Sequence, residues 1–154
     1  FFKQKTAYDI IAGDWSSDVC SSDLSYERVR TAYQLSKEPE HAIVRADAIR
    51  EALVFASRVP LETAQLAVQV AGIAATVAEV GNSNAVTDAC VAALMAEAAC
   101  KGAVLNVRIN VASLDEEGTK IGAELASAAR ACLDAASVHA RVAEAAAERA
   151  MGPA

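Results

Sequence analysis

Four polar residues recur at helical spacing in the most apolar part of this chain. The run from Ala85 to Ala112 is hydrophobic at nearly every position, which predicts a helix buried on several sides. Polar groups buried in such a helix cost free energy unless they have partners. At about 100° per residue, four of them share one stripe: Asn84, Asp88, Asn106 and Asn110. A carboxylate in this stripe suits general acid or base catalysis, and the amides suit hydrogen bonding to a polar ligand.

The stripe is too long for one small ligand. A rise of about 1.5 Å per residue separates Asp88 from Asn106 by about 27 Å, so the two cannot contact one small molecule within a single subunit. The sequence therefore predicts two polar clusters, one at each end of the helix, or one site completed across a dimer. The alternative is a purely structural role without a ligand. The asparagines would then cap neighbouring helix ends, and Asp88 would accept backbone N–H groups at the start of its own helix.

The elements that must position these residues are helices. The chain has 37 alanines among 154 residues, and alanine is the strongest helix former. We therefore expect an all-α fold, a multi-helix antiparallel up-and-down array that forms dimers. The apolar periodicity, the prolines and an S-x-x-E capping box at Ser113–Glu116 predict five helices: Tyr26 to about Ser36, Pro39 to about Ser57, Pro60 to Val80, Ala85 to Ala112, and about Leu114 to Ala150.

Composition excludes several classes of partner. The net charge of −6 and the pI near 4.9 argue against nucleic acid, which needs a surplus of Lys and Arg. No uninterrupted apolar run reaches the roughly 18 residues of a membrane span, and no secretory signal is recognisable, so we expect a cytoplasmic protein without a membrane partner. The cysteines and histidines have no metal-ligand spacing, so no metal is expected.

The composition changes near residue 24. Residues 1–24 hold four of the seven aromatic residues and a short Ser-Ser-Asp repeat, without an amphipathic period. This segment resembles translated sequencing-adapter read-through, and we expect it to be non-native; a genuine polar tail is the alternative. Residues 25–154 are expected to form the helical domain.

Three segments carry a resemblance to a known family: VPLETA at residues 59–64, GNSNAVTDA at 81–89 and GAVLNVRINVASLDEE at 102–117. In this order and spacing they resemble the cyclodeaminase/cyclohydrolase family of folate enzymes. The resemblance implies an all-helical, dimeric protein whose substrate is a tetrahydrofolate derivative. It also implies C–N bond chemistry that interconverts 5-formimino- or 10-formyltetrahydrofolate and 5,10-methenyltetrahydrofolate.

The resemblance suggests a role for each candidate site residue. Asp88 would be the general acid or base and stabilise the cationic carbon, with Thr87 orienting its carboxylate. Amides would hydrogen-bond the pterin or the one-carbon bridge: Asn82, Asn84 and Asn106. Lys101 and Arg108 would meet the folate glutamate tail, or Lys101 would instead pair with Glu97 four residues earlier.

The chain departs from the family pattern at its N-terminal side. The helix pair with a Pro-x-Pro-Gly-Gly-Gly-Ser loop is not found in the sequence, so the domain is expected to be incomplete there. Two further hypotheses follow. The chain is a non-catalytic helical dimerisation module, or it is an inactive fragment of the enzyme.

Overall fold

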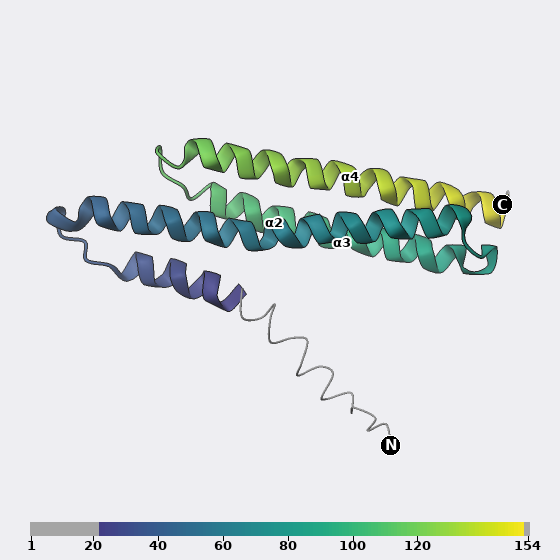
Figure 1. Ribbon diagram of the computed structural model, residues 1–154, viewed down its shortest axis with the longest axis horizontal. Helices are drawn as coiled ribbons and strands as arrows, with labels where there is room; N and C mark the ends of the chain where they lie inside the picture. The colour runs from purple at the N-terminus through teal and green to yellow at the C-terminus, as the bar shows by residue number, and fades with distance from the viewer. Residues whose placement is uncertain (1–21, 153–154) are drawn as a thin grey trace, which may run out of the picture.

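The computed structural model describes residues 22–152, and these form helices without a strand (Figure 1). The expected all-α fold is therefore confirmed for this part of the chain. The first helix covers residues 22–34. It is followed by η1 (Pro39–His41), α2 (Ala42–Val80), η2 (Ser83–Ala85), α3 (Val86–Val111) and α4 (Thr119–Met151). Most of the segment expected to be non-native, residues 1–21, lies outside the described residues, while residues 22–24 are helical.

The three long helices run up and down beside one another (Figure 1). The first helix lies along the first half of α2, antiparallel to it. Arg28 stacks on the Phe55 ring, with 4.1 Å from its guanidinium carbon to the ring centroid. Farther along, Arg45 of α2 donates a hydrogen bond to the carbonyl of Tyr33. These contacts fix the first helix over one half of α2 and leave the other half uncovered on that side.

The core is built mainly from alanine. Small side chains let helices approach closely, so the methyl groups of the core alanines are buried between helices. One cluster, near the α3–α4 turn, adds the larger side chains of Leu61, Val104, Val107 and Leu125. The other, near the α2–α3 loop, is almost purely alanine around Val86. The packing therefore extends along the whole length of α2, α3 and α4.

Pro60 does not begin a helix, contrary to the prediction. It lies inside α2, which is a single helix of 39 residues. An internal proline costs about 3 kcal/mol because it lacks the N–H that would bond to the carbonyl four residues earlier. That carbonyl belongs to Ala56, and the side chain of Asn110 donates to it at 2.9 Å. Packing on both sides of Pro60 and this substitute donor keep the helix continuous.

The predicted capping box at Ser113–Glu116 is also wrong. These residues form the α3–α4 turn, and α4 begins later, at Thr119. The Ser113 hydroxyl donates back to the carbonyl of Ile109, at 3.1 Å, instead of capping the next helix. Asp115 is held elsewhere, because Arg50 of α2 donates to both of its carboxylate oxygens, at 2.8 and 2.7 Å. These hydrogen bonds therefore join the α3–α4 turn to α2.

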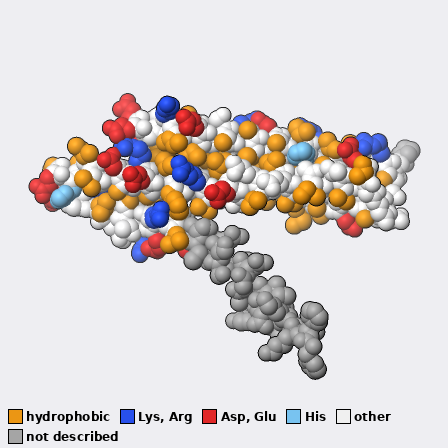
Figure 2. All heavy atoms as spheres, viewed as in Figure 1, with side chains coloured by type: hydrophobic (Ala, Val, Ile, Leu, Met, Phe, Trp, Pro, Cys, Tyr) orange, Lys and Arg blue, Asp and Glu red, His pale blue; other side chains and the backbone are white. Residues whose placement is uncertain are grey.

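The prediction that α3 is buried on several sides is wrong as well. Only one face of α3 is buried in the described part of the chain, because α2 and α4 are the only long helices that pack against it. Several large apolar side chains of α3 are exposed: Val91, Leu94, Met95, Leu105 and Ile109. Figure 2 shows that charged side chains on the visible face gather toward the end that carries the α3–α4 turn.

By length and composition alone, two helical stretches are apolar enough to cross a membrane: Pro39–Val80 and Ser83–Val111. The sequence analysis predicts no membrane span because it counts every charged residue as the end of an apolar run. An 18-residue window that contains one or two charges is still hydrophobic on average. Core helices of soluble proteins pass the same test, so this finding is weak evidence for a membrane.

Candidate active site

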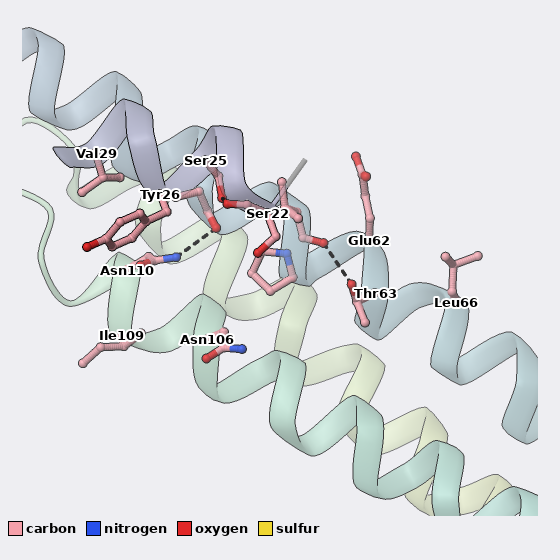
Figure 3. Close-up of a pocket in the computed structure, with 13 residues that line it drawn as sticks. Ser22, Ser25, Tyr26, Val29, Glu62, Thr63, Leu66, Asn106, Ile109 and Asn110 are labelled. Carbon is pink, nitrogen blue, oxygen red and sulfur yellow. Dashed lines mark hydrogen bonds between the residues drawn. The ribbon is translucent and has the colours of Figure 1, made fainter. Parts of the chain in front are cut away.

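A pocket of about 700 Å³ lies between the first helix, α2 and α3 (Figure 3). Its apolar wall includes Val29, Val59, Pro60 and Leu66. Its polar lining comes from Tyr26 of the first helix, Glu62 and Thr63 of α2, and Asn106 and Asn110 of α3. An apolar pocket with a few converging polar groups is the usual form of a small-molecule site.

Asn110 is fixed at the back of this pocket. Its side-chain nitrogen donates to the Ala56 carbonyl that Pro60 leaves without a backbone partner. The amide therefore joins α3 to α2 at the point where the proline interrupts the helix ladder, and a dashed line marks this hydrogen bond at Asn110 in Figure 3. Among the predicted stripe residues, Asn110 thus bonds a backbone carbonyl in the middle of α2, and does not cap a helix end as the structural interpretation expected.

Asn106 lies one turn before Asn110 on α3, and both residues line the pocket (Figure 3). Within residues 22–152 its side chain makes no hydrogen bond, and the residue is exposed. An amide that faces a pocket with both its donor and its acceptor unused is suited to bind a polar heterocycle. Asn106 is therefore the predicted site residue that the structure places best for ligand contact.

Sequence reasoning assigned no role to Glu62 and Thr63, although both belong to the VPLETA segment. The Thr63 hydroxyl donates to the carbonyl of Val59 at 3.3 Å. Glu62 is exposed, and in Figure 3 its carboxylate extends away from Asn106. The signal that could have identified Glu62 and Thr63 is their position next to Pro60, in one of the three segments that resemble the family.

Four of the predicted site residues lie at the opposite end of α3. Asn82 accepts a hydrogen bond from the backbone N–H of Asn84, at 3.0 Å, and so caps η2. Thr87 and Asp88 are exposed in the first turn of α3, and in the described chain no hydrogen bond joins them. None of these four residues lines the pocket.

The distance between the two groups follows from the helix itself. Because α3 is continuous from Val86 to Val111, Asp88 stays about 27 Å along the axis from Asn106. A single chain therefore presents two separate polar clusters. This is the first of the two arrangements that the sequence predicts, with one cluster at each end of the helix.

The charged edge of α3 faces α4 rather than the pocket. Glu97 pairs with Lys101 at 2.8 Å and accepts a hydrogen bond from the Ser137 hydroxyl of α4 at 2.7 Å. The expected ion pair is therefore present. Lys101 and Ser137 lower the pKa of the Glu97 carboxyl below its ordinary value. Arg108 is exposed, and neither it nor Lys101 lines the pocket.

The described cysteines are free thiols packed within the helices. Cys100 is buried, and Cys90 and Cys132 are half-buried. Burial raises the pKa of all three thiols, which keeps them protonated at neutral pH. Within residues 22–152 no three His, Cys, Asp or Glu side chains gather in a group that could hold a metal ion.

Comparison with known proteins gives the pocket its context. Residues 19–130 match the formiminotransferase-cyclodeaminase family. This chain belongs to that family. It is also 41% identical over 93 residues to a methenyltetrahydrofolate cyclohydrolase of Methylorubrum extorquens (strain AM1). The aligned part covers 60% of this chain and 45% of that relative, so the chain spans about half the length of the curated protein it matches.

The part of the chain that matches the formiminotransferase-cyclodeaminase family includes both polar clusters. It contains the first helix, α2, α3 and the beginning of α4, and therefore every described residue that lines the pocket. The pocket brings together two of the three segments that carry the resemblance, VPLETA around Pro60 and GAVLNVRINVASLDEE around Asn106. The third segment, GNSNAVTDA, lies at the far end of α3 with Asp88.

Proposed function

We propose that this chain carries part of the site of a folate one-carbon enzyme. The reaction interconverts 5-formimino- or 10-formyltetrahydrofolate and 5,10-methenyltetrahydrofolate. The observation that carries the proposal is the pocket itself: two sequence segments that resemble the folate family converge on it from α2 and α3, in a chain that belongs to the family. Its volume of about 700 Å³ falls in the range of small-molecule sites.

Both reactions need one proton shuttle and a stabilised cation. In cyclodeamination, N10 attacks the carbon of the formimino group, loses its proton, and ammonia leaves with a proton, which gives the methenyl bridge. In cyclohydrolysis, water adds to the methenyl carbon and releases one proton. The bond from that carbon to N5 then breaks while the remaining hydroxyl proton moves to N5, which gives the 10-formyl product. A carboxylate can move these protons and stabilise the positive carbon.

We assign the chain's residues to these tasks as follows. Asn106, in the pocket, hydrogen-bonds the pterin or the one-carbon bridge. Asp88 of the second subunit of a homodimer is the general acid or base, because about 27 Å of helix separates the two residues within one chain. Asn82, Asn84 and Thr87 precede Asp88 in the α2–α3 loop and the first turn of α3, and they contribute hydrogen bonds to the substrate. Arg108, which has no ion pair in the described chain, meets the anionic tail in preference to Lys101, because Lys101 is engaged with Glu97.

Cyclohydrolysis is the form of the reaction that we favour, because the identified relative is a methenyltetrahydrofolate cyclohydrolase. Cyclodeamination, a lyase reaction, is the alternative within the same site. We further propose that the protein is cytoplasmic, that it needs the tetrahydrofolate substrate but no metal, and that it acts as a homodimer.

A second candidate function is a helical dimerisation module without catalysis. The observation that favours it is the amount of apolar surface left exposed on α2 and α3, since monomeric proteins rarely expose large contiguous apolar patches. The two candidates differ in whether the pocket binds a folate.

The test is turnover of 5,10-methenyltetrahydrofolate, followed by the loss of its absorbance, with formiminotetrahydrofolate assayed separately. Asp88→Asn keeps the shape of the side chain but removes its charge and basicity. It should lower turnover by about 10²- to 10⁴-fold. Ser127→Ala, on the exposed surface of α4, is the matched control and should leave turnover unchanged. Normal turnover in Asp88→Asn would remove Asp88 from the mechanism.

A further inference from the structure

Two cavities follow one another along the seam between α2 and α3. The first is the pocket of Asn106, whose lining includes Ala56 and Asn110. The second has a volume of about 170 Å³, and its lining includes Leu53 and Ser113. These two residues lie about one helical turn from Ala56 and Asn110, on the side of the α3–α4 turn. A ligand that fills the first cavity and extends along the seam therefore reaches the second.

Arg45 lines the second cavity without a carboxylate partner in the part of the chain that the structure describes. Its guanidinium lies 6.0 Å from the centroid of the Tyr33 ring and donates through Nη2 to the Tyr33 carbonyl, at 3.4 Å. The Nε atom of Arg45 is buried, and nothing within residues 22–152 accepts its hydrogen. A buried donor without an acceptor is destabilising and rare in folded proteins, so this N–H indicates a partner that the described chain does not supply.

Arg50, in the same cavity, is fully paired. It donates to both carboxylate oxygens of Asp115, at 2.8 and 2.7 Å, and it also pairs with Asp47 and Glu117. The lining of the cavity thus holds two guanidinium groups and one carboxylate, which is already engaged. The whole chain has a net charge of −6, yet none of its described carboxylates pairs with Arg45. The cavity is therefore left with one available positive charge.

A carboxylate is the acceptor that suits Arg45. A guanidinium presents its N–H groups as a planar fork that matches the two oxygens of a carboxylate. The folate of the proposed reaction carries such a group at its far end, because its pterin continues into an aminobenzoyl ring and a glutamate. Ser113 lies seven residues, about 10 Å of helix, beyond Asn106. This separation is comparable with the extended length of the ring and the glutamate.

We propose that Arg45 binds a glutamate carboxylate of the folate tail, with the pterin in the Asn106 pocket and the aminobenzoyl ring along the seam between them. This proposal rests on the proposed function and says where the far end of its substrate lies. The first helix forms one side of the path, because Tyr26 and Val29 line the first cavity (Figure 3) and Tyr33 holds Arg45. An aromatic ring packs well against such side chains.

Arg45 and Arg108 have different positions relative to this path. At about 100° per residue, Arg108 is about 200° around α3 from Asn106. It lines neither cavity. In a single chain Arg45 therefore takes the first glutamate, and Arg108 is left for carboxylates that extend beyond it.

The contribution of the glutamate to binding tests this assignment. Titration calorimetry compares 5-formyltetrahydrofolate with 5-formyltetrahydropteroyl methylamide, which lacks the glutamate; neither compound is a substrate of the proposed reaction. We expect the wild type to bind the glutamate form about tenfold more tightly, and Arg45→Met to bind both forms equally. Arg58→Met, at an exposed position of α2 that lines neither cavity, is the matched control and should keep the tenfold preference.

The ratio of the two affinities separates tail binding from a change of fold. If Arg45→Met displaced the first helix, both ligands would lose affinity and the preference would survive. A preference that survives in Arg45→Met, or a wild type that binds both forms equally, would overturn Arg45 as the carboxylate site and leave the folate pocket supported. A wild type that binds neither form would instead contradict the proposed function.

The Nε–H group of Arg45 gives a direct readout of the contact. Its NMR resonance is identified by its absence from the spectrum of Arg45→Lys. We expect this resonance to shift when 5-formyltetrahydrofolate is added and to stay in place when the methylamide is added. An unmoved resonance in a wild type that prefers the glutamate form would place the carboxylate elsewhere and overturn the proposal.

Discussion

The side-chain amide of Asn110 donates to the carbonyl of Ala56, the carbonyl that Pro60 leaves without its helical N–H. The two helices that form the pocket are therefore joined at the point where one of them has an unpaired backbone group. This bond keeps α2 continuous at Pro60. It also fixes the position of α3 along α2 at which Asn106 lines the pocket.

Asn110→Ala should lower the free energy of unfolding by about 1 kcal/mol, because the Ala56 carbonyl loses its substitute donor. In a Pro60→Ala background the loss should shrink, since residue 60 then supplies its own N–H. Urea unfolding of the four proteins in a double-mutant cycle measures this coupling. Asn106→Ala, one turn away and without a described hydrogen bond, is the control. Equal losses in both backgrounds would contradict the role given to Asn110.

Arg50 should make the stability of the chain depend on acid pH. Its hydrogen bonds hold the pKa of the Asp115 carboxyl below the ordinary value. The stabilisation is therefore present above the unfolded pKa of about 3.9 and is lost as pH falls through the lower folded pKa. Arg50→Gln should lower the melting temperature at neutral pH and flatten its decline in acid. Arg130→Gln breaks only the exposed pair with Asp134 and should do neither.

Ser137→Ala should raise the pKa of the Glu97 carboxyl and cost about 1 kcal/mol of stability, because the hydroxyl of α4 hydrogen-bonds that carboxylate. Lys101→Met should also raise this pKa but cost less than about 0.5 kcal/mol, because the lysine is largely exposed. An NMR titration of Glu97 with thermal unfolding of both variants measures the two effects. A larger stability loss in Lys101→Met would contradict this ranking.

Gly102→Trp should weaken self-association, because a bulky ring would stand among the exposed apolar side chains of α3, such as Met95 and Leu105. Ala123→Trp, at an exposed position of α4, is the matched control and should leave association unchanged. Sedimentation velocity over a range of concentrations measures the difference. If both variants associate as the wild type does, the second copy packs elsewhere.

The sequence was sufficient to predict features that depend only on residues close together in the chain, such as helices and distances along one helix. Alanine content and apolar periodicity indicated the helices, and the rise of the helix alone separated Asp88 from Asn106. The errors have distant causes. The sequence predicts a helix start at Pro60, because the substitute donor that keeps the helix continuous, Asn110, lies 50 residues farther along the chain. It predicts a capping box at Ser113–Glu116, because the Arg50 that binds Asp115 comes from α2.

The pocket was the part of the site that could not be predicted. It forms only when the first helix lies along α2, and that placement depends on contacts such as Arg28 on Phe55. The sequence singled out the segments around Pro60 and Asn106 separately. Their convergence on one cavity is a tertiary result, and it favours Asn106 over the residues of the α2–α3 loop for ligand contact.

Binding of 5,10-methenyltetrahydrofolate to the full chain is the most direct measurement of the pocket's role. Isothermal titration calorimetry of the wild type, Asn106→Ala and the control Ser127→Ala compares the three dissociation constants. We expect the wild type and Ser127→Ala to bind equally and Asn106→Ala to bind about tenfold more weakly, as for the loss of about 1.4 kcal/mol of hydrogen bonding. Equal affinity in all three proteins, or no binding by the wild type, would contradict a folate site between α2 and α3.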